Sequence, residues 1–241
     1  MLILSRLLLA VAALCALAVA ISGPGYRLGW WPLPVAFSLL RTPVWAGLGA
    51  MAIALFVAIR ARPGTGRKGF GTAVLAFVIA AGAIAGPLAL AWRAWGVPAI
   101  HDITTDTAQP PEFVAILPLR AKAPNTAVYG GPELARAQQA AYPRVVPLEL
   151  PIPPAAAFER ALALVRELGW TVVAADAAQG RIEATAITPW FGFQDDVVLR
   201  IASAGSGSRV DMRSLSRIGR SDLGKNAQRI EDFLGRLAQA R

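Results

Sequence analysis

Three long apolar runs in the first 92 residues limit the folds open to this chain. They cover residues 2–21, 43–59 and 70–92, and this part of the chain holds seven Lys/Arg and no Asp or Glu. A helix rises about 1.5 Å per residue and the hydrocarbon core of a bilayer is about 30 Å thick, so apolar runs of about 20 residues predict membrane-spanning helices. We expect residues 1–95 to form a membrane region of three hydrophobic helices.

The first two runs leave alternatives open. The first run has Arg6 before its apolar core and the small residues Ala18 and Ala20 near its end, which is the pattern of a cleaved signal peptide. Its length of 20 residues favours a retained anchor instead. The second run has only 17 residues, and a longer helix would have to continue through Pro43, which proline disfavours.

The distribution of charge predicts how the chain lies in the membrane. The loop between the second and third runs carries four positive residues and no acid, and such loops remain in the cytoplasm. We therefore expect a cytoplasmic N-terminus and a periplasmic location for residues 93–241. The net charge is +9, but the part after residue 92 balances 17 Lys/Arg against 15 Asp/Glu. The basic excess belongs to the membrane half, so it indicates topology and argues against nucleic acid as a partner.

The composition is that of a bacterial inner-membrane protein. The chain is 55% hydrophobic and 16% charged, which excludes an ordinary soluble globule and a disordered chain. Its only cysteine, Cys15, lies in the first apolar run, so the outer domain has no disulfide framework. With the Ala- and Arg-rich usage, this predicts the inner (cytoplasmic) membrane, with the lipid bilayer as a partner.

The rest of the chain divides into a proline-rich segment and an α+β domain. Residues 96–144 contain several prolines, and we expect them to leave the membrane as an extended segment. From residue 145 on, the apolar periodicity predicts the order β-α-β-β-β-β-α. The last three strands alternate apolar residues with Arg, Glu, Asp or Thr. We predict that residues 145–241 form an antiparallel sheet with two helices on its apolar face, a helix-grip-like layout.

One histidine and nearby acids are the candidates for catalysis. His101 is the only histidine and stands next to Asp102. Metal sites usually need three or four protein ligands, so we expect no metal and no cofactor. Acid–base catalysis by His101, Asp102 or Asp222 would require the proline-rich segment to fold over the polar sheet face and bring these groups within about 2.6–3.2 Å. The alternative is that they only cap helices and form structural hydrogen bonds.

An aromatic hairpin and nearby charges are the candidates for a ligand or partner surface. Residues 188–196 join two strands with three aromatic residues around a glycine, followed by two adjacent acids. Aromatic residues there either pack over the end of the core or contact lipid, ligand or a partner. The two acids lie next to each other in a strand, so they point to opposite faces. The candidate surface residues are Trp190, Phe191, Phe193, Asp195, Asp196, Arg213, Arg217 and Arg220.

Several short motifs resemble a bacterial family, the domain of unknown function 1499. They are IHDITTD at residues 100–106, PPEF at 110–113, TPWFGF at 188–193 and GRSDLG at 219–224. The resemblance covers about residues 99–240. It implies an N-terminal membrane segment and one shared surface that includes His101, Asp102, Trp190, Phe191, Asp195, Asp196, Arg217, Ser221 and Asp222, and it implies no particular activity.

These patterns favour a membrane-anchored envelope protein without an enzymatic role. Its outer domain is expected to bind a lipid, an envelope polymer or a protein partner. Two other hypotheses remain open: an envelope hydrolase that uses His101 with nearby carboxylates, and a structural subunit of a membrane complex whose third helix packs through small residues.

Overall fold

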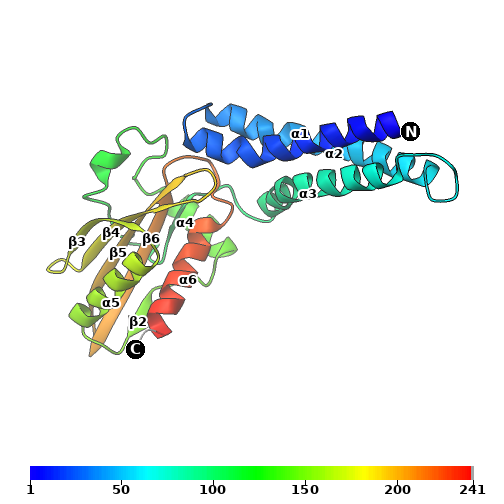
Figure 1. Ribbon diagram of the computed structural model, residues 1–241. Coiled ribbons are helices and arrows are strands. Elements are labelled where there is room, and N and C mark those ends of the chain that lie inside the picture. The colour runs from blue at the N-terminus through cyan, green and yellow to red at the C-terminus, as the bar shows by residue number, and fades with distance from the viewer. Residues whose placement is uncertain (240–241) are drawn as a thin grey trace. The chain divides into compact units, whose positions relative to one another are not determined.

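The computed structural model describes residues 1–239 and divides into two compact units. One consists of Met1–Trp95 with Trp190–Gly192, and the other of Gly96–Pro189 with Phe193–Arg241. The first unit is made of helices, and the second is an α+β domain (Figure 1). The predicted fold class, an apolar helical region followed by an antiparallel sheet with helices, is confirmed.

Three helices of the first unit are long and apolar enough to cross a membrane. They are α1 (Leu2–Arg27), α2 (Leu33–Arg60) and α3 (Phe70–Trp95). Their 26, 28 and 26 residues rise about 39–42 Å, which exceeds the hydrocarbon thickness of about 30 Å. Small side chains form much of the buried contact between them, as is typical of helices that pack closely in lipid. The buried cluster consists of Leu8, Ala50, Ala54, Val57, Ala58, Ala73 and Ala76.

The second helix is longer than the apolar run that predicts it. It begins at Leu33 and continues through Pro43, so the expectation that the proline would limit it to residues 43–59 is wrong. Apolar residues precede Pro43, and a helix is the one local structure that satisfies their backbone groups in lipid. Helices α1 and α3 also pass through an internal proline, Pro24 and Pro87.

The second unit is built on a six-stranded antiparallel sheet. Its strands are β1 (Asp102–Thr104), β2 (Leu148–Leu150), β3 (Thr171–Asp176), β4 (Arg181–Ile187), β5 (Gln194–Ala204) and β6 (Gly207–Ser216). The order is β1-β6-β5-β4-β3, and β2 pairs with the other end of β6. The long central strands β5 and β6 therefore carry most of the side chains that face the two sides of the sheet.

The apolar face of the sheet is covered by two helices. These are α5 (Pro154–Glu167) and α6 (Lys225–Gln239), which lie on one side of the strands in Figure 1. Ile182, Leu199 and Met212 of the sheet are fully buried in one core with Val165 of α5 and Phe233 of α6. Burial of this face is the main source of stability for the domain, because apolar area removed from water contributes about 25 cal/mol per Å².

The opposite face of the sheet is covered by residues 105–130, which we call the strap. The strap contains a short 3₁₀ helix, η1 (Leu117–Arg120), and is followed by α4 (Gly131–Ala141). The sequence predicts an extended segment over residues 96–144, whereas the structure pairs β1 with β6 and folds the strap back over the sheet. The carboxamide of Gln138 fixes the start of the strap, since it binds the Thr104 N–H at 3.0 Å and the Thr104 carbonyl at 2.7 Å.

Candidate functional site: the ion-paired sheet face and the strap

The sheet face beneath the strap is formed by charged side chains at alternate strand positions. Glu183 of β4, Asp196 of β5, and Asp211 and Arg213 of β6 are all buried. A buried charge is costly unless it is paired and hydrogen-bonded. The partners of these four groups show how the strap is held.

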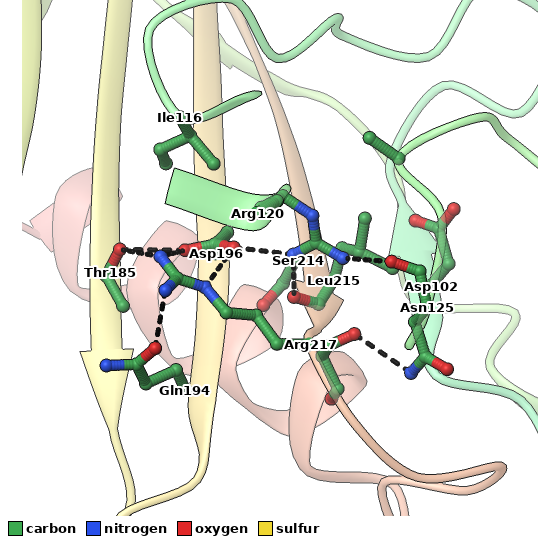
Figure 2. Close-up of polar contacts among 12 residues, drawn as sticks. Asp102, Ile116, Arg120, Asn125, Thr185, Gln194, Asp196, Ser214, Leu215 and Arg217 are labelled. Carbon is green, nitrogen blue, oxygen red and sulfur yellow. Dashed lines mark hydrogen bonds and ion pairs between the residues drawn. The ribbon is translucent and has the colours of Figure 1, made fainter. Parts of the chain in front are cut away.

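Asp196 is the centre of the largest cluster, which Figure 2 shows. Its carboxylate is fully buried and accepts hydrogen bonds from Arg217 Nε and Nη2 at 2.8 Å each, and from Thr185 Oγ1 at 2.7 Å. Arg120 of the strap reaches the same carboxylate with Nη1 at 2.5 Å. Arg120 also donates to the Asn125 carbonyl, so it ties η1 to the following loop. One carboxylate thus serves two guanidinium groups from two parts of the chain.

Asp102 and Arg213 form a second buried pair. Arg213 binds the Asp102 carboxylate through Nε at 2.9 Å and Nη2 at 2.8 Å. Its guanidinium lies 5.0 Å from the centre of the Phe113 ring and 5.5 Å from that of Tyr129, a distance at which cation–π attraction acts. Burial, assisted by the charge of Asp102 and opposed by that of Arg213, raises the pKa of Tyr129 to about 12.

Glu183 binds the strap through backbone groups alone. Its fully buried carboxylate accepts hydrogen bonds from the N–H groups of Val114, Ala115 and Ile116 at 2.9–3.1 Å. These N–H groups lie just before η1, so the carboxylate fixes the chain at the point where this short helix begins. The strap is therefore attached to the sheet by Arg120, by Arg213 and by Glu183.

A third cluster lies at the edge of a hollow of about 520 Å³ between the strap and strands β4 and β5. Arg200 faces this hollow but already binds Asp106 at 3.0 Å and Asp211 at 2.9 Å. Burial alone would raise the pKa of Asp106, but the N–H groups of Gln109 and Ala108 and the Arg200 guanidinium hold it below its ordinary value. The Arg200 charge is thus neutralised within the domain, and the hollow offers no strongly cationic site.

The candidates for catalysis each have a structural partner. His101 Nδ1 lies 3.3 Å from the Arg220 carbonyl oxygen, and Asp102 is bound to Arg213. Asp222 accepts hydrogen bonds from the N–H groups of Gly224 and Asn226 and so caps α6. Burial raises the pKa of Asp222 above its ordinary value, and the nearby charge of Asp195 acts in the same direction. The arrangement supports structural hydrogen bonding, the alternative left open by the sequence.

The candidates for a ligand surface divide into exposed and buried groups. Trp190 is 48% exposed and Arg220 is exposed, whereas Phe191, Phe193 and Arg217 are half-buried. The acids point to opposite faces as expected: Asp195 binds Arg229 of α6 at 2.6 Å, and Asp196 binds the strap. Asp195, Asp196 and Arg213 are buried in ion pairs, so a ligand could reach them only if the domain opened.

Sequence reasoning missed the residues that hold the strap and those that the strap exposes. Arg120 and Gln138 bind partners 76 and 34 positions away, and nothing local marks them. The strap also leaves Val114, Leu117 and Leu119 at 48%, 45% and 55% exposure. We call these three residues the strap surface. Their apolar character next to Pro118 was the one signal in the sequence that could have drawn attention to them.

Metal ligation finds no support in the part of the chain that the structure describes. No group of three or more His, Cys, Asp or Glu residues within residues 1–239 is placed to hold a metal ion. The acids of the sheet face are instead bound to arginines of the same domain.

Comparison with known proteins identifies the family. No curated protein matches the sequence. A family model described as "Protein of unknown function (DUF1499)" matches residues 102–237, which include β1, the strap, the ion-paired face and most of α6. Because this match takes in more than half of the 241 residues and confirms the resemblance seen in the motifs, the chain belongs to the DUF1499 family.

Proposed function

We propose that the protein is a membrane-anchored interaction module whose DUF1499 domain binds its target on the periplasmic side of the bacterial inner membrane. Three helices suited to crossing a bilayer support the anchor. The end of α2 and the α2–α3 loop together carry four positive residues and no acid, which favours the cytoplasm for that loop and the opposite side for the domain after α3. The target class is a lipid, an envelope polymer or a protein.

One observation carries this proposal: the domain holds apolar side chains in solvent on a firmly attached segment. Glu183, Arg120 and Arg213 fix the strap from below, while Leu117 and Leu119 face outward. These buried contacts hold the exposed apolar side chains of the strap in a fixed position on the sheet. Exposed apolar groups grouped on one segment are typical of interaction sites.

In-cell photocrosslinking of the full chain tests the proposal. A photoreactive amino acid replaces Leu119 in one variant and Trp190 in another. The control replaces Glu159, an exposed residue of α5. We expect adducts from Leu119 or Trp190, identified by mass spectrometry, at a yield well above that from Glu159.

The captured molecule identifies the target class. A protein, a lipid or a glycan adduct each supports an interaction module and names its target. Yields at Leu119 and Trp190 no higher than at Glu159, with the variants folded by circular dichroism, would refute the proposal.

A further inference from the structure

A cluster of positive charges lies at one end of the three-helix unit. Arg60 at the end of α2 and Arg62, Arg67 and Lys68 in the α2–α3 loop are all exposed. The amino terminus belongs to the same end, because a Cβ atom at Gly69 would lie only 3.2 Å from the Leu2 nitrogen. The positive ends of the α1 and α3 helix dipoles add to this charge.

Three arginines of this cluster line a common pocket. Arg60, Arg62 and Arg67 surround about 350 Å³ together with Ile59 and Thr65. The loop is ordered by a turn in which the Thr65 N–H and Oγ1 both donate to the Arg62 carbonyl, at 3.2 and 2.8 Å. Arg67 Nη1 lies 3.5 Å from the Arg60 carbonyl, which brings its guanidinium back toward the end of α2.

No carboxylate of the membrane unit neutralises these charges. The first acidic residue in the sequence is Asp102, beyond the end of α3. The three guanidinium groups that line this pocket have no acid beside them in the membrane unit, so they are available to an anion from outside the chain.

The surroundings of the pocket indicate which anion. Guanidinium groups bind phosphate oxygens through paired hydrogen bonds. Ile59, which lines the pocket, and Phe56, one turn earlier, are exposed apolar residues at the end of a helix suited to a bilayer. A phosphate that is joined to acyl chains matches both features, and basic pockets between membrane helices bind such headgroups.

We infer that the pocket formed by Arg60, Arg62 and Arg67 is a binding site for the headgroup phosphate of an anionic phospholipid. It is separate from the interaction surface proposed for the DUF1499 domain. The site predicts saturable binding of one lipid, in contrast to the diffuse attraction that scattered basic residues exert on a membrane surface.

Lipid binding to the purified full chain tests the inference. The chain is delipidated in a neutral detergent, and binding of short-chain phosphatidylglycerol is measured by native mass spectrometry and by calorimetry. The parallel probes are short-chain phosphatidylcholine and inorganic phosphate. We expect one phosphatidylglycerol bound, with an affinity at least about tenfold lower in the Arg62→Gln/Arg67→Gln variant, as expected for losing charge-assisted contacts.

Arg41→Gln is the matched control, because it removes one exposed positive charge from another part of α2. It should leave the affinity unchanged. Both substituted loop arginines are exposed, so folding should be preserved. If the double variant nevertheless misfolds, Arg62→Lys/Arg67→Lys retains the charge but loses the paired hydrogen bonds and should bind more weakly than the wild type.

Three results would overturn the inference. Equal affinity of the loop variants and the wild type would place any lipid site elsewhere. Equal binding of phosphatidylcholine would show that the negative charge is irrelevant. Inorganic phosphate that binds as tightly as phosphatidylglycerol would show a phosphate site that does not use the acyl chains.

Discussion

Asp196 is the shared partner of two guanidinium groups, the buried one of Arg120 and the half-buried one of Arg217. Replacing it by Asn removes the negative charge shared by Arg120 and Arg217 but nearly preserves the shape of the side chain. Breaking a buried ion pair costs about 3–5 kcal/mol, because the remaining partner stays buried and unpaired. We expect Asp196→Asn to lower the free energy of unfolding by about that amount in urea titrations of the full chain.

The control for Asp196 is an exposed ion pair of the same domain. Arg144 binds Glu231 at 2.9 Å, but its side chain is 83% exposed. Arg144→Gln should cost less than about 1 kcal/mol, because solvent screens such pairs. A similar loss from both substitutions would contradict the role assigned to the buried cluster.

Tyr129 predicts a specific response to alkaline pH. Its buried hydroxyl has no hydrogen-bond partner among the described residues, and its pKa is raised to about 12 from 10.0. The folded state therefore holds the phenol proton more tightly than the unfolded state. The resulting stability is complete below pH 10 and is lost as the pH rises through about 12.

Tyr129→Phe removes this titration. The variant should match the wild type or exceed it in stability at pH 7, because an unsatisfied hydroxyl is lost. Between pH 10 and 12 its stability should fall less than that of the wild type. Thermal unfolding of the variant and of the wild type, at pH 7 and at a pH between 10 and 12, measures the difference. Parallel decline of the two proteins would show that Tyr129 does not titrate as described.

At the scale of elements, Glu183 determines whether the strap moves with the sheet. Glu183→Gln weakens three backbone hydrogen bonds at the start of η1, and hydrogen bonds to charged groups contribute about 1.5–3 kcal/mol. We expect amide hydrogen exchange in residues 105–130 to become at least about tenfold faster, while α5 and α6 keep their protection.

Glu159→Gln is the control for the strap experiment, since Glu159 is exposed on α5. It should leave exchange in the strap unchanged. If Glu183→Gln instead accelerates exchange equally in the strap, α5 and α6, the strap and the core would form a single cooperative unit.

The sequence predicts the elements of this protein better than it predicts their long-range partners. The apolar stripe of Phe158, Leu162 and Val165 identifies α5, and alternation identifies β4 to β6, because both patterns depend on near neighbours. The continuation of α2 through Pro43 escaped prediction, since the proline penalty is offset by the demands of the lipid environment. The polar sheet face was visible as alternating charges. The sequence does not predict that Arg120 covers this face, because its partner Asp196 is 76 residues away.

At the scale of the whole molecule, the two units differ in their balance of acidic and basic residues. The DUF1499 domain pairs its buried carboxylates and guanidiniums with one another. The membrane unit has positive residues but no acid, since the first acid of the sequence is Asp102. This asymmetry is a consequence of placing one unit in a bilayer, where positive loops set the orientation.

Cysteine labelling of intact cells measures that orientation. In a Cys15→Ala background, Thr65→Cys places one thiol in the exposed α2–α3 loop and Glu159→Cys places one on exposed α5. We expect a membrane-impermeant maleimide to label position 159 in intact cells and position 65 only after the inner membrane is opened. The physical reason is the four positive residues at the end of α2 and in the loop, which resist transfer across an energised membrane. Labelling of position 65 in intact cells, with position 159 protected, would place the DUF1499 domain in the cytoplasm and direct the search for its target there.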